Sequence, residues 1–277
     1  MKYDAWRRIK KVEKEYLNSL LRLVRIFNKI ASSSGNDKDK YMQMMLNFQN
    51  SEQYNNYINS AVRRMVTPLE VGNQRTWREA AKKATKGKFL YSLLMEELQK
   101  SGNRAIQNQM IENVSLIKTL PEDVAEKVVH DIAENALKGK RAKSIESIIR
   151  NKTNEHARAS ARLIARTETA KVQSALTKAR SEELGLRWYI WRTALDGNRV
   201  RKSHRLMEGV LVSWSDPPSP EELAGEKNVG HYHAGNIWNC RCYSEPLIEI
   251  DDISWPHKVY YQGKIQSMSK SKFAEIM

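Results

Sequence analysis

Apolar residues recur at helical spacing through the first part of the chain, with lysines and arginines at many of the positions between them. Within residues 6–30 and again within 41–66 they return every three or four positions, as they do on one face of an α-helix. A serine-rich break ending at Gly35 separates these two segments, and Pro68 and Gly72 are expected to end the second one. The pattern therefore predicts two amphipathic helices before residue 72.

Helical segments are predicted to continue as far as Gly185. A helix over 120–137 has Pro121 and two acidic residues in its first turn, which is the composition that suits a helix N-terminus. A long helix over 154–184 has Thr153 as its N-cap and Gly185 directly after its end. Shorter helical patterns cover 75–85, 89–118 and 144–150.

The pattern changes after Gly185. Residues 188–191 are aromatic and β-favouring, and 210–212 form a second short apolar run, so both segments are predicted to be strands. Prolines and glycines then fill a long irregular segment over 217–235, and the residues after 251 are compatible with a short hairpin and a frayed end. These short runs predict a separate C-terminal module.

Together the segments predict an α-rich, α+β fold class, with a multi-helix N-terminal body followed by a small α+β C-terminal module. The chain of 277 residues with 40% hydrophobic content is long enough for such units to have apolar cores. The expected divisions are a basic helical body over 1–139, a helical connector over 140–185, a module over 186–250 and a C-terminal extension over 251–277.

Positive charge is concentrated in the helical part. The net charge is +15, and residues 1–185 hold 35 Lys/Arg against 21 Asp/Glu, whereas 186–277 hold 12 against 11. Such an excess favours a polyanionic partner, with nucleic acid as the leading candidate, although a basic helical surface also serves solubility alone. The candidate DNA contacts are Arg158, Arg162, Lys82, Lys83, Lys140 and Arg141.

Cys240 and Cys242 are separated by one residue and need an explanation of their own. No apolar run approaches the ~18–20 residues of a membrane span and the first residues lack a signal-peptide pattern, so we expect a cytosolic origin, where a disulfide framework is implausible. Zinc is one explanation, since His204, His231 and His233 lie in the same module and a tetrahedral site needs four ligands. Two alternatives remain open, namely simple packing in the core and a redox-active thiol pair.

A second polar cluster contains Asp196, Arg199, Arg201 and His204. Such a cluster grips phosphate or cleaves phosphodiesters, with His204, Asp196 and Glu168 as the alternative catalytic residues, or it serves only to order the turn around Asp196. Because no nucleophile motif, phosphate loop or paired-carboxylate metal site accompanies it, the structural interpretation is favoured and no catalytic residue is predicted. The tryptophans at 188, 191, 214 and 238 are expected to form the core of the module more readily than to stack on bases.

Five motifs of the C-terminal half stand in an order that resembles a known family. They are Arg166-Thr167-Glu168, Trp191-x-Thr193 followed by Asp196, Arg199-Val200-Arg201-x-x-His204, Met207-x-Gly209 and Asn239-Cys240-Arg241-Cys242. With this set, residues 140–250 resemble the Mu F-like family of phage head-morphogenesis proteins, also called minor head or minor capsid proteins. The chain departs from the family pattern directly before Cys240, where residues 237–239 replace the Pro or His that relatives commonly show.

The resemblance implies a minor head protein of a tailed bacteriophage, located inside the head in the virion and in the host cytoplasm during assembly. It implies association with the portal protein, with other head proteins and with packaged double-stranded DNA, bound without sequence preference during head morphogenesis and DNA packaging or delivery. We expect no membrane partner, small-molecule substrate or enzyme activity, and zinc is the one cofactor considered. The alternative is a phosphodiesterase that acts on nucleic acid inside the head.

Overall fold

The computed structural model describes residues 6, 10–83, 102–137, 145–195 and 200–277. The chain divides into two compact units, each built from segments that are far apart in the sequence. The helical unit comprises residues 10–67 and 108–166, and the sheet unit comprises 1–9, 68–107 and 167–277. The divisions predicted from the sequence remain predictions, because they follow the order of elements along the chain whereas these units follow the packing.

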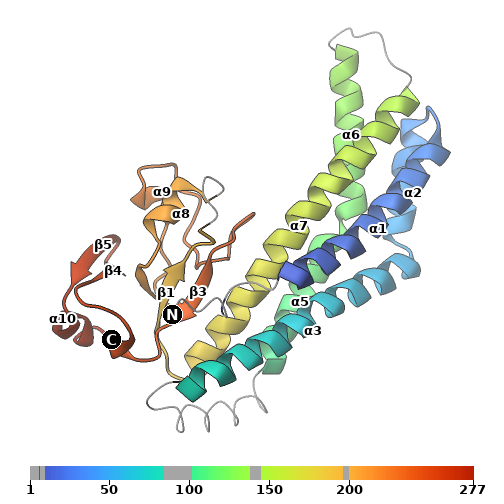
Figure 1. Cartoon of the computed structure of the whole chain (residues 1–277). Helices are drawn as coiled ribbons and strands as arrows, with labels where there is room; N and C mark the ends of the chain where they lie inside the picture. Colours follow the sequence, from blue (N-terminus) through green and yellow to red (C-terminus); the bar gives the residue numbers. More distant parts are fainter. Residues whose placement is uncertain (1–5, 7–9, 84–101, 138–144, 196–199) are drawn as a thin grey trace. The chain divides into compact units, whose positions relative to one another are not determined.

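The helical unit consists of helices that the apolar spacing largely predicts (Figure 1). Its N-terminal elements pack together, since α2 contacts both α1 and α6. Asp37 caps α2 by accepting hydrogen bonds from the N–H groups of Asp39 and Lys40. The elements are α1 (Lys10–Ser34), α2 (Lys38–Gln49), the first part of α3 (Glu52–Lys83), most of α5 (Gly102–Lys118), α6 (Leu120–Leu137) and the first part of α7 (Ile145–Glu183).

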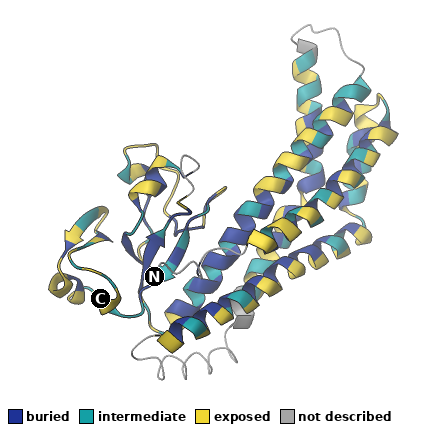
Figure 2. Ribbon diagram, in the orientation of Figure 1, coloured by how far each residue is buried: buried dark blue, intermediate teal, exposed yellow. Residues whose placement is uncertain are grey.

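The apolar faces of these helices form the core of the helical unit. Buried and exposed residues separate onto different faces of α1, where Phe27 is fully buried (Figure 2). Polar groups in this core are hydrogen-bonded, since Tyr41 Oη lies 2.7 Å from Thr153 Oγ1 and Tyr54 Oη donates to Ile117 O at 2.5 Å. Buried polar groups that find partners in this way do not destabilise the core.

Two predicted helix boundaries are wrong in the N-terminal half. The segment over 41–66 is broken at Ser51, whose Oγ accepts a hydrogen bond from Tyr54 N at 3.1 Å and so starts α3. Pro68 does not end α3, which continues to Lys83. The residues beyond the proline include the buried Trp77, and packing of an apolar face outweighs the local cost of a proline in a helix.

A third boundary is wrong in the middle of the chain. The two helices predicted over 144–150 and 154–184 form one helix, α7, because Thr153 is buried against Tyr41 and does not cap a new helix. The helix over 120–137 is confirmed as α6, and the pattern over 89–118 is confirmed only for α5, since residues 84–101 lie outside the described part.

The sheet unit contains a five-stranded sheet with the strand order β3-β1-β2-β4-β5 (Figure 1). β1 pairs antiparallel with β2 and β3, β2 pairs parallel with β4, and β4 and β5 form an antiparallel hairpin. The two predicted strands and the hairpin after residue 251 are therefore confirmed. The strands are β1 (Trp188–Arg192), β2 (Leu211–Ser213), β3 (Tyr243–Pro246), β4 (His257–Tyr261) and β5 (Lys264–Met268).

Successive residues of β1 point to opposite faces of the sheet and belong to two different cores. Tyr189 and Trp191 lie in a cluster that also contains both cysteines. Trp188 and Ile190 lie in a second cluster with Phe273 of α10 (Lys270–Ala274), and the rings of Trp188 and Phe273 are 5.0 Å apart. β1 is thus buried on both faces, which accounts for its uninterrupted apolar sequence.

The α-rich, α+β fold class predicted from the sequence is confirmed. None of the helices in the described ranges combines the length and the apolar composition that a membrane span requires.

A buried ion pair joins α3 and α7 inside the sheet unit. Arg180 Nη2 lies 2.5 Å from Glu70 Oε1, and the Arg180 side chain is 2% exposed. Asn73 accepts a hydrogen bond from Arg180 and donates one to Thr177 Oγ1 at 2.9 Å. Because a charge in the interior needs partners of this kind, the pairing constrains how the two helices approach each other.

Glu70→Leu is expected to lower the free energy of unfolding by about 3–5 kcal/mol, because it leaves Arg180 buried without its carboxylate. The double variant Glu70→Leu/Arg180→Met removes both charges and should be more stable than the single variant. Glu79→Leu is the matched control. Glu79 pairs with Arg75 on the exposed face of the same helix, so this change should lower the free energy of unfolding by less than about 1 kcal/mol. Urea unfolding measures all three, and equal losses for Glu70→Leu and Glu79→Leu would contradict the prediction.

Candidate metal centre

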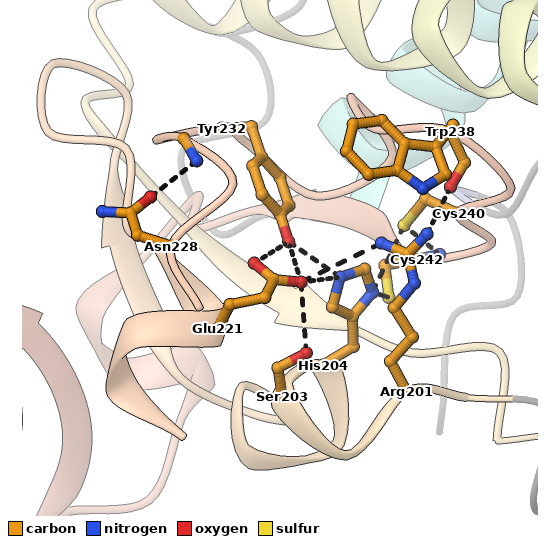
Figure 3. Close-up of polar contacts among 10 residues, drawn as sticks. Arg201, Ser203, His204, Glu221, Asn228, Tyr232, Trp238, Cys240 and Cys242 are labelled. Atoms are coloured by element: carbon orange, nitrogen blue, oxygen red, sulfur yellow. Dashed lines mark hydrogen bonds and ion pairs between the residues drawn. The ribbon is translucent and has the colours of Figure 1, made fainter. Parts of the chain in front are cut away.

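One face of the sheet carries a cluster of buried polar side chains (Figure 3). α8 (Lys202–Leu206), which lies between β1 and β2 in the chain, carries His204. α9 (Pro220–Leu223) carries Glu221, and the irregular segment before β3 carries Tyr232, Cys240 and Cys242. All five side chains are buried, so each must find its polar partners within the protein.

The backbone holds the segment that carries the cysteines in one conformation. Asn239 has a φ of 56°, and its N–H donates to Thr167 Oγ1 of α7 at 3.1 Å. Gly235 has a φ of 87°, and a Cβ added there would lie 3.1 Å from Cys242 O. Only glycine accommodates both this positive φ and this close approach to the Cys242 carbonyl without strain. The Cys242 N–H also donates to Cys240 Sγ at 3.4 Å, which fixes the two cysteines relative to each other.

His204 lies between the two sulfurs and Tyr232 (Figure 3). Its Nδ1 is 3.5 Å from Cys240 Sγ and 3.4 Å from Cys242 Sγ. Its Nε2 is 3.0 Å from Tyr232 Oη. Both ring nitrogens are therefore directed at protein atoms, with the sulfurs on one side and the phenol on the other.

Glu221 orders the hydrogen bonds on the Nε2 side of the histidine. Tyr232 Oη donates to the Glu221 carboxylate, whose oxygens lie 2.8 and 2.6 Å away, and Ser203 Oγ donates to Oε1 at 3.3 Å. The single phenol proton is directed to the carboxylate, so the phenol oxygen accepts from His204 Nε2–H. This assigns the proton of a neutral imidazole to Nε2 and leaves the Nδ1 lone pair facing the sulfurs.

The two thiols have opposite pKa shifts. The hydrogen bond from Cys242 outweighs burial and holds the pKa of Cys240 well below its usual range. The pKa of Cys242 is well above its usual range, because it is the hydrogen-bond donor to Cys240 and because burial opposes a second charge. Burial, followed by the hydrogen bond to Glu221, raises the pKa of Tyr232.

His204, Cys240 and Cys242 form a group that could hold a metal ion. Their ligand atoms, Nδ1 and the two Sγ atoms, all lie within 4.8 Å of one another. The C-x-C spacing noticed in the sequence places both sulfurs on the same side of their segment, where they face His204. Thiolate and imidazole are ligands that zinc accepts.

Two other predicted ligands do not lie with the cysteines. His231 is exposed, and its Nδ1 is 2.9 Å from Pro217 O. His233 is buried elsewhere in the core, with Nδ1 3.2 Å from Tyr189 Oη and Nε2 3.4 Å from Lys178 Nζ. The structure thus brings one of the three predicted histidines to the sulfurs.

The alternative catalytic set is not assembled in the described part of the chain. Asp196 and Arg199 lie outside the described residues. Glu168 is buried on α7 and forms an ion pair with Lys171 at 3.2 Å, while the ring nitrogens of His204 face Tyr232 and the thiols. The geometry therefore gives His204 the role of a ligand or a core hydrogen-bonding group.

The tryptophans divide into core and surface. Three are buried as predicted, at positions 188, 191 and 214. Trp238 is 49% exposed, and the Arg201 guanidinium lies 5.5 Å from the centre of its ring. Arg201 also donates to Trp238 O at 2.9 Å, so this arginine is held at the edge of the cluster.

The candidate DNA contacts that the structure describes are exposed. Arg158 and Arg162 lie on the surface of α7 in the helical unit, and Lys82 and Lys83 lie in the last turn of α3. Lys140 and Arg141 lie outside the described residues.

Glu221 and Tyr232 are the site residues that sequence reasoning missed. Tyr232 stands between the two histidines that drew attention as ligands, and Glu221 follows the proline-rich part of an irregular segment. Neither position has a periodicity or a spacing that relates it to His204. Only the folded chain shows that the two side chains meet.

His233→Gln is expected to reduce the loss of stability in acid. Burial, followed by the charge of Lys178, lowers the pKa of His233 from 6.5 to about 4. Below pH 6.5 the unfolded chain takes up a proton that the folded chain does not, so folded-state stability falls as the pH decreases towards 4. The shift corresponds to at most about 3 kcal/mol.

Urea unfolding of wild type and variant at pH 7 and pH 4 measures this difference. His231→Gln, an exposed change in the same segment, is the control and should keep the wild-type pH dependence. If the free energy of unfolding fell equally from pH 7 to pH 4 in wild type and His233→Gln, the prediction would be wrong, because the folded chain would then take up the His233 proton as readily as the unfolded chain.

Comparison with known proteins connects this region to a phage family. Residues 126–245 match the family described as Phage Mu protein F like protein. An uncharacterized protein of Haemophilus influenzae is 32% identical over 142 residues, a match that covers 50% of this chain and 29% of that protein. No solved structure matches the chain. Residues 126–245, which include His204, Glu221 and both cysteines, therefore resemble the Mu F-like family, as the ordered motifs predicted, and are called the Mu F-like region below.

Proposed function

We propose that this chain is a minor head protein of a tailed bacteriophage that contacts the portal and packaged DNA inside the head. The observation that carries the proposal is the Mu F-like region over 126–245 in a chain whose residues 1–185 have 35 Lys/Arg against 21 Asp/Glu. A protein enclosed with packaged DNA is surrounded by phosphate, and a basic helical surface is suited to that environment. The role in packaging or delivery and the contact with the portal are parts of this proposal.

Exposed arginines on α7 support the contact with DNA. Arg158 and Arg162 are one helical turn apart on the surface of the helical unit, and Arg158 Nε donates to Asn154 Oδ1 at 3.0 Å. Their side chains are accessible to phosphate oxygens, which bind arginine through charge-assisted hydrogen bonds. Contacts of this kind position a protein on DNA without reading its sequence.

The buried state of the polar cluster favours a role without catalysis. His204 is 3% exposed and makes its contacts with Tyr232, Cys240 and Cys242. A phosphodiesterase needs a base that reaches its substrate, and in the described residues this histidine faces the interior. The non-enzyme function is therefore the one that the geometry supports.

The double variant Arg158→Glu/Arg162→Glu tests the contact with DNA. The wild-type chain is expected to bind duplexes of unrelated sequence with similar affinity, and its affinity should fall steeply as salt rises because counterions are released. The double variant should bind more weakly, with the slope of log affinity against log salt reduced by about 2. Fluorescence anisotropy over a series of salt concentrations measures both quantities.

Lys264→Glu/Lys272→Glu is the matched control, because it changes the net charge equally at exposed positions of β5 and α10. This control should stay close to wild type. The contact is disproved if wild type does not bind at low salt, or if the two double variants weaken binding equally.

Particles of the parent phage test the location in the head. The chain is expected to remain in purified, nuclease-treated particles at few copies, and chemical cross-linking should join it to the portal protein. Mass spectrometry of intact particles and of their cross-linked peptides measures both. Loss of the chain during particle purification would contradict a place inside the head.

A further inference from the structure

We propose that the sheet unit binds one zinc ion through Cys240 Sγ, Cys242 Sγ and His204 Nδ1. The three ligands come from α8 and from the irregular segment before β3, two parts of the chain that no strand pairing joins directly. The ion is structural and holds them together. This inference goes beyond the proposed function and does not depend on DNA binding.

The distances between the ligand atoms match a tetrahedral zinc ion. With Zn–S of about 2.3 Å and Zn–N of about 2.0–2.1 Å, a sulfur and a nitrogen ligand lie about 3.6 Å apart at the tetrahedral angle. The observed separations from His204 Nδ1 are 3.5 Å to Cys240 Sγ and 3.4 Å to Cys242 Sγ. Both sulfur–nitrogen separations are therefore close to those that the ion requires.

Hydrogen bonding alone accounts less well for this arrangement. Nδ1 of a neutral imidazole has one lone pair, which suits one hydrogen bond donor. Here two sulfurs lie at nearly equal distances from the same nitrogen. A single ion at the point where the Nδ1 lone pair and both sulfurs converge explains all three positions.

The residues around the ligands prepare His204 for a metal. The hydrogen bonds from His204 through Tyr232 to Glu221 place the ring proton on Nε2, and a ligand histidine in metal sites usually donates its other N–H to such a partner. The Cys242 N–H donates to Cys240 Sγ, which stabilises a thiolate there. Tyr232 and Glu221 are thus positioning residues.

The ligand set selects the kind of ion. Two thiolates and one imidazole suit zinc and disfavour magnesium or calcium, which require oxygen ligands. Among the described residues, no further His, Cys, Asp or Glu places a ligand atom within 4.8 Å of all three, so we assign the fourth position to a water molecule. Binding releases the thiol protons to solvent as the thiolates form.

Burial of the ligands indicates a structural ion. His204, Cys240 and Cys242 are 3%, 3% and 5% exposed, so a substrate has no approach to the ion in this conformation. The segment over 224–242 has no helix or strand and gains a fixed anchor near its end. Bound zinc contributes to folding when the unfolded chain lacks a preformed site.

A second His-containing group, on α6, is a weaker candidate. His130, Asp131 and Glu134 also have ligand atoms within 4.8 Å of one another, but His130 and Glu134 are exposed. Asp131 is already engaged by His156 Nε2 at 2.8 Å. The group on α6 therefore serves as an internal reference for the metal analysis.

The test measures zinc per chain in full-length protein purified without a histidine tag under reducing conditions. About one zinc per chain is expected for wild type. His204→Gln and Cys240→Ser should lose it, whereas His231→Gln, His233→Gln and the α6 variant His130→Gln should retain it. Tyr232→Phe should retain zinc but weaken binding about 10–100-fold in competition with a chelator.

X-ray absorption of the wild-type protein keeps the test independent of whether the variants fold. Two sulfur and two nitrogen or oxygen neighbours are expected at zinc, and Co²⁺ in its place should show thiolate charge-transfer bands. The proposal is overturned if wild type binds no stoichiometric zinc when zinc is added to reduced protein. It is also overturned if the bound zinc has no sulfur neighbours, or if His231→Gln loses zinc as His204→Gln does.

Discussion

The buried carboxylate of Glu221 constrains the arrangement of one whole face of the sheet. A charge in the interior must be surrounded by donors, and Tyr232 and Ser203 both direct their hydroxyls to it. Tyr232 has then used its proton, so its oxygen can only accept, and His204 donates from Nε2. The remaining ring nitrogen faces the cysteines as a consequence. Tyr232, Ser203 and His204, from two parts of the chain, thus take their orientation from one negative charge.

A second buried carboxylate acts in the same way on the helices of the sheet unit. Glu70 pairs with Arg180, and Asn73 links the same arginine to Thr177. These contacts join the part of α3 beyond Pro68 to the part of α7 beyond residue 166. α7 also provides Thr167, which accepts from Asn239 N–H and so positions the segment with the cysteines. The helices and the candidate metal centre of this unit are therefore linked by specific polar contacts, each of which would be costly to break in the interior.

The Mu F-like region ends within β3 and does not include β4 or β5. The hairpin of β4 and β5 nevertheless belongs to the same sheet, because β4 pairs with β2 in parallel. Within the matched region, the chain departs from the family pattern directly before Cys240. There Ile237 is buried, and Trp238 is 49% exposed and contacts Arg201. Neither side chain can replace a histidine ligand. The candidate metal centre therefore depends on His204 and on the hydrogen bonds that orient it.

Local patterns in the sequence determined the elements and the candidate chemistry, and the tertiary structure decided which residues meet. The apolar spacing with acidic residues in the first turn was enough to define α6 to its ends, and the aromatic run gave β1, because both signals depend on neighbours along the chain. The C-x-C pair, with three histidines in the same module, likewise made zinc one of the candidate explanations for the cysteines. By contrast, Pro68 reads locally as a helix end, and only the buried Trp77 beyond it explains why α3 continues. The choice of His204 over His231 and His233 also required the fold. Its partners Tyr232 and Glu221 lie 28 and 17 residues further along the chain, beyond β2, and no periodicity relates the three positions. Only packing and the need to pair buried polar groups bring them together.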